Sequence, residues 1–120
     1  MSKTSTGKFA EDLASKFLTK KGYKVIARNF HSRFGEIDIV ASKEDCLVFV
    51  EVKARWSAEF GLPEEAVGKR KLSSIIKTAE YFRALHPGLP ESERIDVVAM
   101  EFAAENKVKR VEILENVSEF

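Results

Sequence analysis

The chain has 120 residues, 44% of them hydrophobic and 32% charged, with a net charge of +1. These values indicate one globular domain spanning residues 1–120 and exclude a disordered or fibrous chain, while a single cysteine excludes an internal disulfide framework. The chain lacks a signal-like segment and any apolar run of membrane-spanning length, so we expect a cytoplasmic protein with no membrane partner.

A first helix is predicted over residues 6–21, because apolar residues recur there at helical spacing and Gly22 supplies a stop. At about 100° per residue, Glu11 lies beside Leu18 at the border of the apolar face. Its carboxylate is therefore either a solvated or salt-bridged helix acid, or an acid that points along the core edge towards a site.

Residues 23–34 are predicted to form a strand followed by a turn. Basic side chains with aromatic residues between them occur along this segment, including Lys24, Arg28, His31 and Arg33. Such interleaving suits phosphate contacts, although a solvated sheet edge has the same pattern. His31 has no partner at metal-ligand spacing, so a zinc site is not expected.

Residues 35–53 are predicted to form two apolar strands joined by a polar turn. With Glu44 and Asp45 as a two-residue turn, the antiparallel register sets Asp38 directly opposite Glu51. Two carboxylates would then face each other on strands that are otherwise suited to a buried core.

Period-two alternation assigns the side chains of this hairpin to its two faces. On the first strand Ile37 and Ile39 share one face, and Asp38 lies on the other. On the second strand Glu51 and Lys53 share a face, so a lysine accompanies the two carboxylates.

The loop after the hairpin carries Trp56 and Phe60, which form either a substrate-contacting flap or a cover over the end of the core. A second helix is predicted over residues 67–85. Lys71 lies on nearly the same side as the apolar residues of this helix, so it either extends to water or reaches a neighbouring site.

Two further strands are predicted over residues 94–102 and 107–114, and residues 113–120 are expected to form a loose acidic tail. The element order is helix, three strands, helix, strand, strand. A helix between the third and fourth strands has the length of a crossover that joins parallel strands. We therefore expect an α/β fold with a mixed central sheet flanked by helices.

The facing carboxylates indicate a specific chemistry. Two such groups repel each other unless a proton or a cation lies between them. Mg²⁺ resolves the repulsion with Asp38 and Glu51 as ligands, the backbone carbonyl of Val52 as a third ligand, and waters and substrate phosphate elsewhere. Lys53 would then orient or deprotonate the attacking water in phosphodiester hydrolysis. The alternative is a partly exposed hairpin whose acids only form salt bridges.

The hairpin contains the segments Gly35-Glu36-Ile37-Asp38 and Phe49-Val50-Glu51-Val52-Lys53, with Arg55 after them. These segments resemble the PD-(D/E)xK nuclease superfamily, and most closely its small bacterial YraN-like family. The resemblance spans most of the chain. It implies the restriction endonuclease-like α-β-β-β-α-β core, here with an extra C-terminal strand.

The chain is also similar to archaeal Holliday-junction resolvases, in which a first-helix glutamate joins the metal site, and this implies a catalytic role for Glu11. The superfamily name calls for proline before the metal-binding aspartate, whereas this chain has Ile37. That difference leaves the ligand chemistry intact. Glu36 is an additional acid on the face of Asp38, which either supports the metal ligands, binds a second metal ion, or is an acid at the sheet edge.

The expected function is therefore a Mg²⁺- or Mn²⁺-dependent nuclease that hydrolyses phosphodiester bonds in DNA, in preference to RNA, with selectivity for branched or single-stranded structures. The residues expected to contact phosphates are Arg28, Arg55, Lys69, Arg70 and Lys71. The alternative is a nucleic-acid-binding or scaffold protein of the same fold without catalytic turnover. A homodimer would suit symmetric substrates, but the sequence does not encode one.

Overall fold

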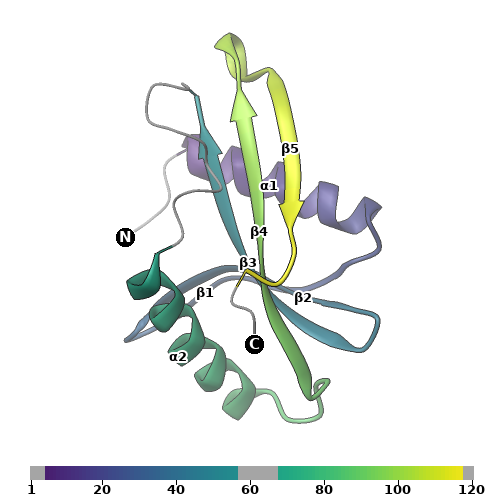
Figure 1. Cartoon of the computed structure of the whole chain (residues 1–120), viewed down its shortest axis with the longest axis vertical. Coiled ribbons are helices and arrows are strands. Elements are labelled where there is room, and N and C mark those ends of the chain that lie inside the picture. Colours follow the sequence, from purple (N-terminus) through teal and green to yellow (C-terminus); the bar gives the residue numbers. More distant parts are fainter. Residues whose placement is uncertain (1–4, 57–67, 118–120) are drawn as a thin grey trace.

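The computed structural model describes residues 5–56 and 68–117. Within them the chain forms α1 (Ser5–Lys20), β1 (Lys24–Ser32), β2 (Gly35–Lys43), β3 (Cys46–Arg55), α2 (Lys69–Leu85), β4 (Ser92–Phe102), the short 3-10 helix η3 (Ala104–Asn106) and β5 (Val108–Leu114). The predicted order of helices and strands is confirmed. Figure 1 shows a strongly twisted sheet, with α1 crossing behind its upper part and α2 at the lower left.

The five strands form one sheet in the order β1-β2-β3-β4-β5. β3 and β4 are parallel, and the other neighbouring strands are antiparallel. Parallel neighbours need a crossover connection, and the segment between β3 and β4 contains α2. The predicted α/β class, with a mixed sheet flanked by helices, is confirmed.

Each helix covers one face of the sheet with its own apolar cluster. The cluster under α1 contains Val48 and Val50 of β3, and the cluster under α2 contains Leu47 and Phe49. Successive residues of β3 thus alternate between two cores, as expected for a strand buried on both faces. Within the described part of the chain, neither helix has the length and apolar character needed to cross a membrane.

The hairpin of β2 and β3 has the predicted turn and register. Glu44 and Asp45 both have positive φ, 48° and 61°, which is the geometry of a type I′ turn. The ladder that starts there runs to Ile39 opposite Val50. The turn residues Glu44 and Asp45 therefore predicted the alignment of the two strands correctly.

The predicted face of Ile37 is wrong. Ile37 packs with Val40 in the cluster under α2, whereas Ile39 lies in the cluster under α1. Strict alternation would have kept Ile37 and Ile39 together. The alternation breaks at Asp38, where a side-chain oxygen accepts the backbone N–H of Val52 at 2.8 Å in place of a backbone carbonyl.

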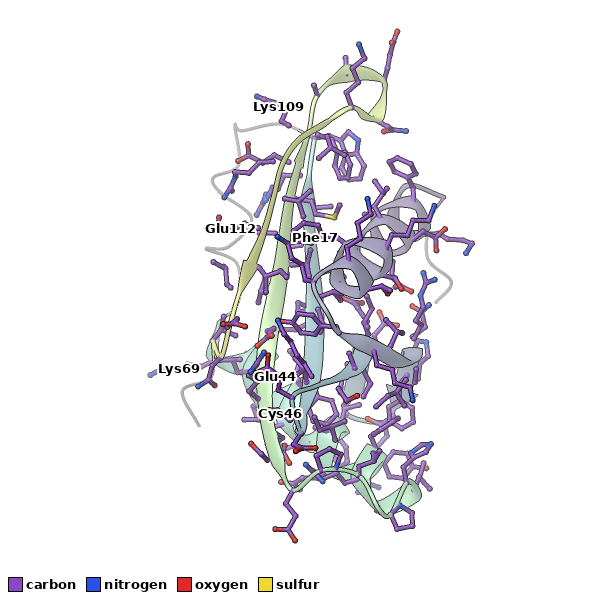
Figure 2. All side chains as sticks on the ribbon, turned by 90° about the vertical axis from the view of Figure 1, so that its right-hand side faces the viewer. Phe17, Glu44, Cys46, Lys69, Lys109 and Glu112 are labelled. Atoms are coloured by element: carbon purple, nitrogen blue, oxygen red, sulfur yellow. The ribbon has the colours of Figure 1, made fainter. Side chains whose placement is uncertain are left out.

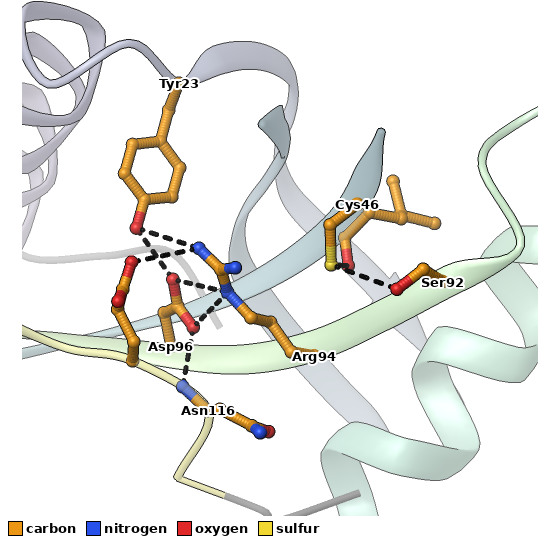
Figure 3. Close-up of polar contacts among 8 residues, drawn as sticks. Tyr23, Cys46, Ser92, Arg94, Asp96 and Asn116 are labelled. Carbon is orange, nitrogen blue, oxygen red and sulfur yellow. Dashed lines mark hydrogen bonds and ion pairs between the residues drawn. The ribbon is translucent and has the colours of Figure 1, made fainter. Parts of the chain in front are cut away.

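The C-terminal residues are tied to β4. Asp96 is fully buried and accepts hydrogen bonds from the Tyr23 hydroxyl (2.8 Å) and the Arg94 guanidinium (3.0 Å). It also accepts the backbone N–H of Asn116 at 2.9 Å (Figure 3). Residues 113–117 therefore differ from the expected loose tail, because this buried carboxylate and the ladder between β4 and β5 hold them in place.

Candidate active site

Asp38 of β2 and Glu51 of β3 form a buried carboxylate pair where the two strands separate. They are 5% and 6% exposed. The hydrogen bond from the Val52 N–H to Oδ2 of Asp38 holds the Asp38 side chain against β3. Asp38 therefore lies close enough to Glu51 to raise the pKa of that residue, whereas the function of the two acids as metal ligands stays a prediction.

Glu51 is strongly perturbed by this environment. Burial raises its pKa to about 7, and the charge of Asp38 and a hydrogen bond with it act in the same direction. Lys71 and Lys53 lower the pKa, and Nζ of Lys71 lies 3.5 Å from Oε2 of Glu51. Two carboxylates this close share a proton or bind a cation. The two lysines supply part of the positive charge that the pair requires.

The N-terminus of α2 concentrates further positive charge beside the pair. The helix begins with Lys69, Arg70 and Lys71, has no acid in its first turn, and is preceded by Gly68, which makes no side-chain cap. Helix N-termini are partially positive and favour acids, so this sequence is unfavourable for the isolated helix. In Figure 2, Lys69 lies on the side of the sheet opposite α1. An anionic partner at this end of α2 would offset the repulsion.

Glu11 lies on α1 and is 1% exposed. Its Oε1 accepts hydrogen bonds from Nε of Arg28 (3.0 Å) and from the side-chain amide of Asn29 (2.7 Å). Arg28 also forms an ion pair with Asp12 at 2.6 Å, and this contact lowers the pKa of Asp12. Glu11 is thus positioned by β1, and its part in a metal site stays a prediction, as does a phosphate contact by Arg28.

The contact of Asn29 with Glu11 was not predicted. Asn29 has φ of 52°, a left-handed conformation that asparagine adopts more readily than most residues. The sequence signal for this conformation is an asparagine inside a strand-like segment. The partner of its amide depends on how α1 crosses β1, which local patterns do not specify.

Glu36 lies outside the carboxylate pair. Its Oε2 is 3.2 Å from Nε2 of His31 on the neighbouring strand. Across residues 5–56 and 68–117, no three side chains of the acidic, histidine or cysteine type gather closely enough to form a metal site by themselves. The structure brings Lys53 and Lys71 to the carboxylate pair, whereas the contacts of Glu11 and Glu36 are with residues of β1.

The carboxylate pair fits a hard divalent cation. Mg²⁺ is commonly bound through one or two carboxylates and keeps water and substrate phosphate in its other positions. A cation here would also remove the like-charge repulsion that raises the pKa of Glu51. The backbone carbonyl of Val52 is a further oxygen donor on the same strand.

Arg55 and Trp56 follow the pair along β3. Trp56 stacks on Phe102 with ring centroids 4.6 Å apart, and its indole N–H donates to Asn106 at 2.8 Å. Of the two predicted roles, this contact favours a cover over the end of the core. Phe60 lies outside the described residues, and a phosphate contact by Arg55 stays a prediction.

A family model described as "Uncharacterised protein family UPF0102" matches residues 10–100. The chain belongs to this family. It is 47% identical over 94 residues to a UPF0102 protein of Syntrophomonas wolfei, covering 78% of this chain and 82% of that protein. It is 42% identical over 119 residues to one of Caldicellulosiruptor bescii (97% and 98% covered) and 45% identical over 100 residues to one of Sulfurihydrogenibium sp. (83% and 87%). The YraN-like resemblance is confirmed at the level of this family.

Proposed function

We propose that this protein is a Mg²⁺- or Mn²⁺-dependent nuclease that hydrolyses phosphodiester bonds in DNA. The observation that carries the proposal is the carboxylate pair, which is buried in the sheet and flanked by two lysines. Burying two acids side by side is costly for stability, and groups perturbed in this way gather at functional sites.

The roles of the residues follow from their positions. Asp38 and Glu51 would hold the cation, and the bound cation would supply Lewis-acid activation of water and of the scissile phosphate. Lys53 shares the face of Glu51 and would orient the attacking water. Lys71, 3.5 Å from Glu51, would offset the negative charge that develops on the phosphate in the transition state.

Two further features support a nucleic-acid substrate. The helix, three strands, helix, strand order, with β3 and β4 parallel, is the order expected of a restriction endonuclease-like core. Lys69 and Arg70 are exposed at the N-terminus of α2, where backbone N–H groups and cations together favour a phosphate. Arg55 at the end of β3 would extend this contact surface.

The test compares cleavage of branched, flapped, single-stranded and blunt duplex DNA in Mn²⁺ and in EDTA. We expect metal-dependent cleavage by the wild type and a loss of about 100-fold or more in Asp38→Ala and in Lys53→Ala, because each change removes a group that acts in the transition state. Glu112→Ala is the matched control, since Glu112 is an exposed acid on β5.

Cleavage that survives in Asp38→Ala would assign the activity to a contaminant. Stable DNA binding without cleavage by any protein in the series would identify a binding or scaffold protein instead. Wild-type activity in EDTA would exclude the metal mechanism.

A further inference from the structure

A second feature lies farther along β2 from the carboxylate pair, at the tip of the hairpin formed by β1 and β2. A cavity of about 460 Å³ opens there, which we call the turn pocket; its lining residues are His31, Ser32, Arg33, Phe34 and Tyr81. The two aromatic residues are 41% and 46% exposed. The volume is within the range of small-ligand sites.

Folding alone does not explain the residues at this tip. The turn consists of Arg33 and Phe34, and neither has the positive φ that calls for glycine or asparagine, so the turn geometry does not require an aromatic residue here. An exposed phenyl ring forgoes the stabilisation that it would gain in the core. The guanidinium of Arg33 and the amine of Lys77 lie 5.0 and 5.8 Å from the centroid of the Phe34 ring. The tip therefore presents an exposed aromatic ring with two cations close to it.

The turn is fixed to α2 by hydrogen bonds. The hydroxyl of Ser74 donates to the carbonyl of Phe34 at 2.6 Å, and the hydroxyl of Ser32 accepts the Phe34 N–H at 3.0 Å. Ser32 also contacts the Thr78 hydroxyl at 2.9 Å. Gly35, at φ +149°, lets α2 approach, because an added Cβ would lie 2.2 Å from Oγ of Ser74. The aromatic tip is thus held in place before any ligand binds, which lowers the entropic cost of binding.

One side of α2 leads from the helix N-terminus near the carboxylate pair to the turn pocket. Phe34 precedes Asp38 by four residues, a span of about 13 Å along β2 at 3.3 Å per residue. On α2, Arg70, Ser74, Lys77 and Tyr81 follow one another at alternating spacings of four and three, so they share one side of the helix. A nucleic-acid strand at the pair can therefore run along α2 and reach the pocket.

We propose that the turn pocket binds an unpaired base of the DNA strand presented to the carboxylate pair. Phe34 and Tyr81 stack on the base, while Arg33 and Lys77 contact the neighbouring phosphates. Aromatic platforms flanked by cations bind single strands without sequence preference, since every base has a stackable face. Bases in a blunt duplex are already stacked and paired. The pocket thus selects DNA with a single-stranded segment, an assignment that rests on the proposed nuclease function.

The test measures binding and not cleavage. Fluorescence anisotropy in EDTA compares a labelled oligothymidylate with an abasic strand of equal length and with a blunt duplex. We expect the wild type to bind the oligothymidylate about 5- to 150-fold more tightly than the abasic strand, the range found for one stacked base. In Tyr81→Ala and in Phe34→Ala this ratio falls towards one, whereas Tyr81→Phe retains it.

Charge is tested separately. Lys77→Ala weakens binding of both the oligothymidylate and the abasic strand, and Lys109→Ala, which changes an exposed lysine on β5, leaves both unchanged. Thermal unfolding confirms that each variant folds. Equal wild-type affinity for the oligothymidylate and the abasic strand would overturn the inference, as would an unchanged ratio in Tyr81→Ala. Metal-dependent cleavage without base-dependent binding would refute only the pocket, and base-dependent binding without cleavage would refute only the nuclease.

Discussion

Replacing Glu51 by glutamine tests the carboxylate pair without any substrate. The pKa of Glu51 rises from 4.5 to about 7 on folding, chiefly through burial and the charge of Asp38. The folded state therefore holds a proton that the unfolded chain releases at lower pH. The stabilisation that this proton gives to the folded state is complete below about pH 4.5 and is lost as the pH rises to about 7. Glutamine keeps the shape of the protonated acid and has no proton to lose.

The expected magnitude follows from this shift. At about 1.4 kcal/mol per pKa unit, the rise corresponds to about 3 kcal/mol. At about pH 8 in EDTA, Glu51→Gln should therefore be more stable than the wild type by up to about 3 kcal/mol, or about 10 °C in Tm for a domain of this size. At about pH 4.5 the two proteins should have similar stability, because Glu51 is then largely protonated.

The assay is thermal and urea unfolding across this pH range, with Glu112→Gln as the control for an exposed acid on β5. The difference in unfolding free energy between the wild type and Glu51→Gln isolates the contribution of Glu51 from those of the other titrating groups. The same pH dependence of stability in the wild type and in Glu51→Gln would refute the reasoning that Glu51 is buried next to a repelling Asp38. Added Mn²⁺ should stabilise the wild type at about pH 8 and have a much smaller effect on Glu51→Gln, because cation binding stabilises only the state that carries both carboxylates.

Three further changes test other parts of the structure. Gly35→Ala should destabilise the protein by about 2 kcal/mol or more in urea unfolding, because only glycine adopts the φ of Gly35 without strain. Gly68 has open space around it, so Gly68→Ala should change the free energy of unfolding by no more than about 0.5 kcal/mol. Asp96→Ala should cost about 3 kcal/mol in the same assay, since it removes a fully buried carboxylate that accepts hydrogen bonds from Tyr23, Arg94 and the Asn116 N–H; a loss below about 1 kcal/mol would contradict this. Lys71 lowers the pKa of Glu51, so in Lys71→Ala the loss of stability due to Glu51 should occur at higher pH. The measurement compares the pH dependence of unfolding of Lys71→Ala with that of the double variant Lys71→Ala, Glu51→Gln.

Much of the hairpin was predictable from the sequence. The apolar strands and a two-residue turn of Glu44 and Asp45 are local features, and turn chemistry fixes the register of the strands that it joins. That register was enough to bring Asp38 and Glu51 together. The same local rule failed for Ile37, because strict alternation assumes a continuous ladder and the Asp38 side chain interrupts it.

The surroundings of the pair were only partly predictable. The position of Lys71 on the inner side of α2 followed from helical periodicity, but its 3.5 Å contact with Glu51 depends on how the crossover helix packs. Glu11 was predicted near the core edge and is buried, yet its partners are Arg28 and Asn29 on β1. Helix patterns specify which side of a helix is buried and leave open which strand residue it meets.

The sequence by itself determined the elements, the α/β class and the closeness of Asp38 to Glu51, because each depends on side-chain periodicity or on a turn of adjacent residues. The tertiary structure alone decided that Lys71 contacts Glu51, that Asp96 holds the C-terminal residues, and that Phe34 and Tyr81 border one pocket. Those contacts join residues far apart in the chain. They form only when two helices settle on opposite faces of a twisted sheet, and no local pattern encodes that packing.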